Sequence, residues 1–405
     1  MKIERGSLLL LAPAIYLFVL PLVHVTVFRA TAFWISVLLL LWTLRTQATP
    51  PIPLKAAFAV WLSVALLTLI WAVHPEFSIR EIKSEIVYGL LSFLIFFKAT
   101  RSSRELRFWG FVLSASALAT GVIALIHFLQ GLDPYPAGKF YGGALCYAGY
   151  VTTVLPMLAA ITILRSGQRR VGMLCLILFL LLMAFGTTNR GVWLYLLVEL
   201  AVFGGLYLIR VDLHPKAKKA AIAIIVASTI VSTGTLFYAA KGRLELAGGP
   251  AKVIAETAKA DLRPQLWIES LAWIRQRPFT GAGFGTMVLG RELQEQQKIP
   301  NHTHAHNIIL NYALQLGLLG PFVLAFLFYS VAREFWKLIK SSDEELQTFG
   351  IAGIAMVSGI LASGMIEDLF ARQVGWLFWS LVGMTLGYAK YKGGQLPSPT
   401  RPAPE

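Results

Sequence analysis

The stretch MLCLILFLLLMAFGTTNRGVWLYLLVELAVFGGLYLI, residues 173–209, decides the fold of this chain. It consists of two apolar runs that flank a short polar step, Thr187–Arg190. A helix needs about 20 mostly apolar residues to cross the hydrocarbon core of a bilayer. The stretch therefore predicts two membrane-spanning helices joined by a turn of a few residues.

The rest of the 405-residue chain repeats this pattern. Hydrophobic residues make up 56% of it and charged residues only 14%, whereas soluble domains usually carry about 25% charged residues. The mean hydropathy is +0.65. We predict an all-α integral membrane protein with about twelve transmembrane helices, at residues 7–28, 30–44, 54–73, 84–98, 106–130, 141–164, 171–187, 191–209, 219–240, 307–332, 348–366 and 371–389.

One long polar stretch interrupts the predicted spans and divides the chain. Residues 1–240 hold spans one to nine, 241–306 form a large outer loop with short helices at 251–260 and 264–276, and 307–390 hold spans ten to twelve. Residues 391–405 are rich in proline and predict a disordered tail. The run at 7–28 is too long for the apolar part of a signal peptide, so we expect it to be retained as a span.

The net charge of +15 reports orientation in the membrane. Cytoplasmic loops carry an excess of Lys and Arg. Alternate loops of this chain hold fourteen of the 36 Lys and Arg residues, and the short outer loops hold far fewer. The fourteen are Lys98, Arg101, Arg104, Arg107, Arg165, Arg169, Arg170, Arg210, Lys216, Lys218, Lys219, Arg333, Lys337 and Lys340. Both termini are therefore predicted to be cytoplasmic and the long loop periplasmic. Because topology accounts for most of the charge, we expect no nucleic-acid partner.

Arginines on the predicted outer side are candidate anion ligands. Arg190 ends an apolar run and is either an anion ligand or an arginine that reaches to the membrane interface. Arg263 stands just ahead of the predicted helix 264–276, and a helix N-terminus with an arginine suits a diphosphate. Arg275 is a further candidate on that helix.

A second basic pair, Arg80 and Lys83, precedes the fourth span. The two are three residues apart and share a helix face. They either bind an anion or pair with Glu81 and Glu85, and such ordinary helix pairs favour the second interpretation.

Three histidines, His302, His304 and His306, fall within five residues. Imidazole suits a general base near neutral pH. We predict no metal ion, because no carboxylate stands at a ligand spacing nearby. A helix starting near residue 305 would rotate His304 and His306 apart by about 200°. The carboxylates of Glu367 and Asp368 are interpreted as structural partners for outer arginines.

Several motifs together resemble the O-antigen ligase and polymerase superfamily. His306-Asn307, nine residues, then Gly317-x-x-Gly320 matches its ligase pattern. Asn189-Arg190 after an apolar span resembles its Ser-Arg step. Arg263-x3-Trp267, followed by Pro278-x2-Gly281-x-Gly283-x-Gly285, is also typical there.

The resemblance implies a glycosyltransferase of the bacterial inner membrane with a periplasmic site and no cofactor or metal. The donor would be an undecaprenyl-diphosphate-linked glycan and the acceptor a sugar hydroxyl of lipid A–core, in an inverting transfer without ATP. It implies His306 as general base with Arg190 and Arg263 at the diphosphate. Lower-ranked contacts to diphosphate or acceptor are Arg275, Arg80, Lys83, His304 and Asn307.

Two alternatives stay open. An O-antigen polymerase or a protein O-oligosaccharyltransferase would share these residues and differ in acceptor. The short segment 131–140 favours the ligase, because polymerases often have a second large outer loop. A flippase or transporter for a lipid-linked anion would use the arginines as a gate. The absence of Walker A and G-x-S-x-G motifs disfavours ATP-driven transport and serine hydrolysis.

Overall fold

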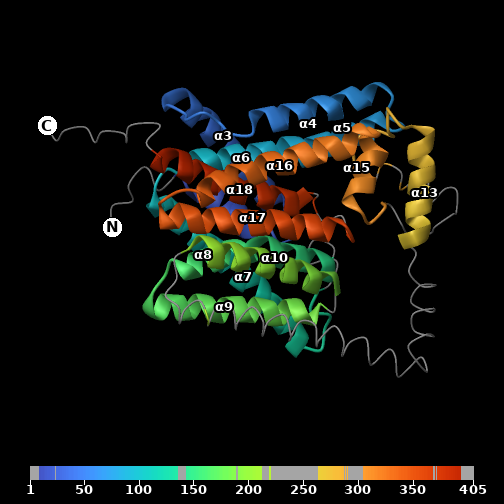
Figure 1. Ribbon diagram of the computed structural model, residues 1–405. Helices are drawn as coiled ribbons and strands as arrows, with labels where there is room; N and C mark the ends of the chain where they lie inside the picture. The colour runs from blue at the N-terminus through green and yellow to red at the C-terminus, as the bar shows by residue number, and fades with distance from the viewer. Residues whose placement is uncertain are drawn as a thin grey trace, which may run out of the picture.

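The computed structural model describes residues 9–22, 24–135, 143–187, 190–211, 219, 263–286, 288, 290, 304–367, 370 and 372–393. Within these residues the chain forms helices and no strands (Figure 1). The α-helices are α2 Leu11–Val19, α3 Thr26–Thr46, α4 Lys55–Leu67, α5 Pro75–Glu81, α6 Tyr88–Ala99, α7 Ser103–Leu129, α8 Ala144–Ile163, α9 Gly167–Gly186, α10 Arg190–Arg210, α13 Arg263–Gln276, α15 Ile308–Leu316, α16 Leu319–Ile339, α17 Glu344–Gly364 and α18 Arg372–Lys392. A 3-10 turn, Thr68–Ile70, follows α4, and a π-helix, Ile82–Val87, joins α5 to α6.

Six helices in this part of the chain are long and apolar enough to cross a membrane. They are α3, α7, α9, α17, and the segments Cys146–Ile163 of α8 and Val192–Arg210 of α10. Large apolar side chains such as Leu38, Phe111 and Leu182 are exposed on the outside of the bundle, where lipid is a better solvent for them than water. The protein is a multi-pass helical membrane protein, and the count of twelve spans stays a prediction.

Three expected spans differ from the helices observed. Most of the run 7–28 gives only the short helix α2, which ends two residues before Pro21, because proline has no N–H with which to continue the helical hydrogen bonds. The expected span 84–98 belongs to a longer helical run that begins at Pro75. The expected span 307–332 is two helices, α15 and α16. The expected span 219–240 and the expected helix 251–260 lie outside the described residues.

The break between α15 and α16 has a packing cause. Leu318 N donates to Pro278 O at 2.7 Å and Ala282 N to Leu314 O at 2.8 Å, so the loop after α13 lies against the end of α15. Gly317 has φ +65°, and a Cβ there would meet Pro278 O at 2.6 Å. Only glycine allows this close approach at positive φ. The hydrogen bonds at this break hold the loop after α13 against the membrane bundle.

The described helices give the bundle two distinct ends. At one end Lys392 pairs with Asp343 at 2.7 Å, and Gln347 Nε2 donates to Arg210 O at 3.2 Å. At the opposite end lie α13 and α15, on the right in Figure 1. Residues of the predicted inner loops therefore meet at one end and those of the predicted outer loops at the other. Which end faces the cytoplasm stays a prediction from the charge pattern.

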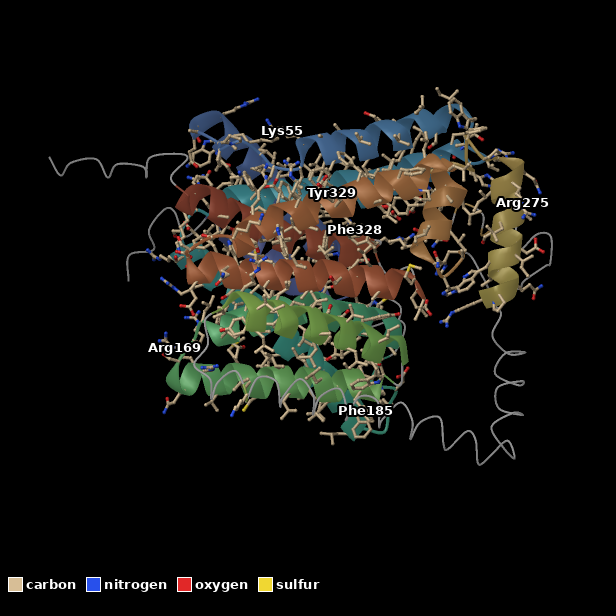
Figure 2. The ribbon with its side chains drawn as sticks, in the orientation of Figure 1. Lys55, Arg169, Phe185, Arg275, Phe328 and Tyr329 are labelled. Carbon is tan, nitrogen blue, oxygen red and sulfur yellow. The ribbon has the colours of Figure 1, made fainter. Side chains whose placement is uncertain are left out.

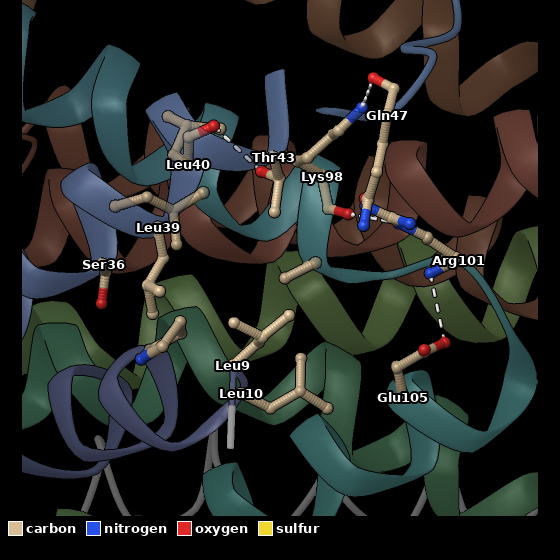
Figure 3. Close-up of a pocket in the computed structure, with 13 residues that line it drawn as sticks. Leu9, Leu10, Ser36, Leu39, Leu40, Thr43, Gln47, Lys98, Arg101 and Glu105 are labelled. Carbon is tan, nitrogen blue, oxygen red and sulfur yellow. Dashed lines mark hydrogen bonds between the residues drawn. The ribbon is translucent and has the colours of Figure 1, made fainter. Parts of the chain in front are cut away.

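A cavity of about 170 Å³ opens at the first end, between α2, α3 and α6 (Figure 3). Leucines from α3 and from the segment just before α2 line one side, and Lys98, Arg101 and Glu105 the other. Lys98 is only 2% exposed. Its ammonium donates to Gln47 O at 3.0 Å, Ala48 O at 2.7 Å and Thr49 Oγ1 at 2.5 Å. This lysine therefore ties the segment after α3 to the end of α6.

Replacing Lys98 by methionine is expected to destabilise the protein by about 1–3 kcal/mol, because three partly buried acceptors after α3 lose their charged donor. Thermal unfolding of the detergent-solubilised protein measures the change. Lys55→Met is the matched control, since Lys55 is exposed at the start of α4 (Figure 2). Equal melting temperatures for the two variants would contradict the structural role of Lys98.

Candidate functional site

Helix α13 carries the first candidate residue. It begins at Arg263, which confirms the predicted helix at 264–276. Pro264 stands in the first turn, where a missing N–H costs no helical hydrogen bond. Leu266, Ser270 and Ile274 form the buried face, and Ile274 packs with Ala282 and Ala313. Packing of this face fixes where the Arg263 end of the helix lies.

The start of α15 carries the histidine motif. Asn307 caps the helix, because its Oδ1 accepts from Ile309 N at 3.0 Å and Leu310 N at 3.1 Å. Its Nδ2 donates to Met365 O at 3.2 Å, beyond the end of α17. Both ends of the Asn307 amide thus hold secondary structure in place, which gives this residue a structural role beside the histidine.

The carboxylate of Glu367 joins two of the candidates. Arg263 Nη2 lies 2.7 Å from Glu367 Oε1, and His306 Nδ1 lies 2.6 Å from Glu367 Oε2. The exposed fractions of the Arg263, His306 and Glu367 side chains are 36%, 21% and 11%. We call these three residues the His306–Glu367–Arg263 cluster. It confirms that Glu367 pairs with an arginine, while the outer position of that arginine stays a prediction.

Neighbouring contacts hold the histidine segment rigidly. Trp267 Nε1 donates to Ala305 O at 3.0 Å, and Ala305 N donates to Asn311 Oδ1 at 2.8 Å. His306 itself has φ +48°, a left-handed conformation that is uncommon outside glycine. Such a conformation persists only where its surroundings enforce it, and it often marks a functional site.

The cluster keeps Glu367 ionised. Burial alone would raise the pKa of this carboxyl, but its contacts with His306 and Arg263 outweigh burial and hold the pKa below its ordinary value. A carboxyl with a lowered pKa contributes stability above its unfolded pKa, about 4.3. That contribution is lost as pH falls through the lower folded value.

Glu367→Gln is therefore expected to lower stability by about 1–3 kcal/mol at neutral pH, because one acceptor for His306 or Arg263 becomes a donor. The difference from the unchanged protein should stay full above pH about 5 and shrink below pH about 4. Melting temperatures of both proteins, recorded from pH 7 down to pH about 3.5, test the direction of this pH dependence. A difference that grows on acidification would contradict the ionised carboxylate.

His304 lies beside His306, and the expected rotation of about 200° between them is wrong. The two ring centroids are 4.1 Å apart, with the rings tilted by 33°. The reason is that α15 begins only at Ile308, so residues 304–306 are not helical. The structure also brings a carboxylate to the histidines: ligand atoms of His304, His306 and Glu367 lie within 4.8 Å of one another. The sequence argument against a metal ion relied on the absence of such a carboxylate.

The start of α10 lies close to the cluster. Helices α10 and α17 pack antiparallel, with Gln347 beside Arg210 at one end. Further along, a Cβ on Gly359 would clash with the Glu199 carboxyl. This register brings the start of α10 toward the end of α17, beyond which Glu367 lies. The Arg190 side chain itself lies outside the described residues, as do His302 and Asp368.

The lower-ranked cations lie apart from the cluster. Arg275 is on the exposed face of α13 near its end (Figure 2). Arg80 packs over the Phe77 ring at 6.0 Å, and Lys83 is exposed in the π-helix. Glu81 pairs with Arg372 at 3.4 Å in place of its expected neighbours. In the described part of the chain, no contact joins Arg275, Arg80 or Lys83 to the cluster.

Two buried residues of the site region were not predicted from the sequence. Tyr195 is fully buried on α10, which packs against α17. Glu199 is four residues further along the same face of α10. Among the described residues, neither Tyr195 Oη nor Glu199 Oε1 has a hydrogen-bond partner. An acidic residue within an apolar run was the available signal, since such residues are rare inside membranes.

Comparison with known proteins agrees with these segments. Residues 174–325 match the model of a family described as O-antigen ligase. The matched range contains the start of α10, α13 and the histidine motif, whereas Glu367 lies beyond it. The match confirms the resemblance to the O-antigen ligase and polymerase superfamily. No curated protein matches the chain.

Proposed function

We propose that this chain, whose residues 174–325 match the family described as O-antigen ligase, is an O-antigen ligase. It would transfer a glycan from undecaprenyl diphosphate to a sugar hydroxyl of lipid A–core on the periplasmic face of the inner membrane. The observation that carries the proposal is the His306–Glu367–Arg263 cluster at one end of a membrane bundle. It joins a base to a cation that suits a phosphate.

His306 is the proposed general base. We assign the proton of the 2.6 Å contact with Glu367 to His306 Nδ1, which leaves the lone pair on Nε2 for the acceptor hydroxyl. The carboxylate then holds the ring in one orientation and stabilises the imidazolium that forms, as a carboxylate does beside a catalytic histidine in other enzymes. Glu367 is thus a positioning residue for His306.

Arg263 and Arg190 are the proposed ligands of the diphosphate. As the acceptor oxygen bonds to the anomeric carbon, the bond from that carbon to the diphosphate oxygen breaks and its electron pair goes to the diphosphate. The acceptor proton goes to His306 Nε2. Positive charge fixed where the leaving group gains negative charge stabilises this transition state. The diphosphate is a good leaving group, so no separate general acid is required.

The same geometry serves a polymerase or a protein O-oligosaccharyltransferase, which differ only in acceptor. Two observations support the ligase: the short outer segment 131–140, and the ligase pattern that begins at His306. For a transporter, polar groups should line a path through several helices. Here the cluster lies at one end of the bundle.

In vitro transfer tests the proposal. Purified protein is mixed with undecaprenyl-diphosphate glycan and rough lipopolysaccharide, with EDTA and without nucleotide, and the lipids are separated on a gel. A glycan ladder on lipid A–core is the expected result. A lengthened donor would instead identify a polymerase. If neither the donor nor the lipopolysaccharide changed, the ligase proposal would be overturned, and a transporter or a different acceptor would be favoured.

A further inference from the structure

We infer that His304, His306 and Glu367 form a binding site for a divalent transition-metal ion of the zinc class, and that an ion bound there inhibits the enzyme. The first half concerns only the geometry of three side chains. The second half relies on the proposed function of His306 as general base.

The three side chains offer the ligands that zinc prefers. Imidazole nitrogens and carboxylate oxygens bind Zn²⁺ at about 2.0–2.2 Å. A tetrahedral ion with such bonds needs ligand atoms about 3.3 Å apart. Here the ligand atoms lie within 4.8 Å of one another, and the two histidine rings are 4.1 Å apart between centroids. Small side-chain rotations therefore suffice to close the three ligands on one ion.

The backbone around the site is already held in position. The two hydrogen bonds of Ala305, to Trp267 and Asn311, fix the residue between the histidines. The Asn307 amide anchors the same segment to Met365, in the turn after α17 that also holds Glu367. Because binding then costs little ordering of the chain, the site is preorganised for an ion. The partial exposure of His306 leaves the ion a route from solvent.

An ion bound at this site would prevent His306 from acting as the general base. A neutral imidazole has one lone pair, so a histidine that binds a metal through either nitrogen cannot accept the acceptor proton. The ion would also compete with Arg263 for Glu367, since both are cations bound by one carboxylate. Zinc is therefore expected to lower transfer and EDTA to restore it. In a metal-dependent transferase, zinc would instead raise the rate of transfer and EDTA would lower it.

Metal binding is measured first, without reference to activity. The full chain, free of any purification histidines, is titrated with Co²⁺, whose visible absorption reports nitrogen and oxygen ligands, and with Zn²⁺ by calorimetry. One ion per chain is expected. His304→Ala and His304→Gln should each weaken binding by at least about tenfold. His24→Ala is the matched control, because His24 is exposed and lies outside the site.

If both His304→Ala and His304→Gln bound the ion as tightly as the unchanged protein, the proposed metal site would be overturned. Thermal unfolding of both variants checks that they are folded. The inhibitory half is tested by adding Zn²⁺ and then EDTA to the transfer assay. A rate that rises with Zn²⁺, or stays unchanged while the site is loaded, would overturn inhibition and leave binding standing. If no transfer occurs under any condition, the proposed function fails, and the Co²⁺ spectrum still decides the site.

Discussion

Replacing His306 by glutamine is expected to lower the rate of glycan transfer by about 10²–10⁴-fold, the usual contribution of a general base. Glutamine keeps much of the size of the ring but cannot accept the proton of the acceptor hydroxyl. The measurement is the initial rate of ladder formation on lipid A–core with both substrates saturating. The loss should appear in kcat, because proton transfer occurs in the transition state.

Two further variants separate chemistry from folding. His306→Asn keeps a side chain that tolerates the positive φ at this position, so its backbone is unstrained. It should be as inactive as His306→Gln. His24→Gln changes an exposed histidine away from the cluster and should keep the full rate. A rate within about threefold of the unchanged protein for both His306 variants would remove His306 from the mechanism.

Replacing Arg263 by alanine is expected to lower kcat by about 10²–10³-fold, because the leaving diphosphate loses a fixed positive charge. The Glu367 carboxylate also loses its contact with Arg263, which leaves His306 less firmly oriented. Arg263→Lys restores the charge without the planar pair of donors, so it should recover only part of the rate. Transfer kinetics with varied donor concentration separate kcat from KM.

The control for Arg263 is Arg169→Ala. Arg169 is exposed at the far end of the bundle, opposite Arg275 (Figure 2), and its loss should leave kcat unchanged. Equal losses for Arg263→Ala and Arg169→Ala would mean that overall positive charge matters and not its position. A loss confined to KM for Arg263→Ala would assign it to ground-state binding of the donor.

Local patterns were enough for the membrane class and for single elements. Apolar runs of about 20 residues predict spanning helices, because lipid leaves the backbone no partner but its own helix. The helix at α13 followed from proline at its start and a helical composition after it. The family motif selected His306, Arg190 and Arg263. Each of these inferences uses residues that are close together in the sequence.

Failures of the sequence interpretation arose where distant segments pack together. The expected span 307–332 is broken at Gly317 by the backbone of the loop after α13. The helix expected near His304 begins later, since Asn307 caps it and is itself held by Met365. Both outcomes depend on neighbours that local propensity does not contain.

The sequence by itself determined that this protein lies in a membrane, that it is helical, and which residue types are available for chemistry. Only the tertiary structure decided that His306 and Glu367, 61 residues apart, share a hydrogen bond, and that Glu367 also holds Arg263, 104 residues away. It also placed His304 beside His306. The physical reason is that hydropathy and helix propensity depend on residues near one another in the sequence. The cluster depends instead on the contact of Asn307 with Met365 beyond α17 and on the packing of α13 against α15.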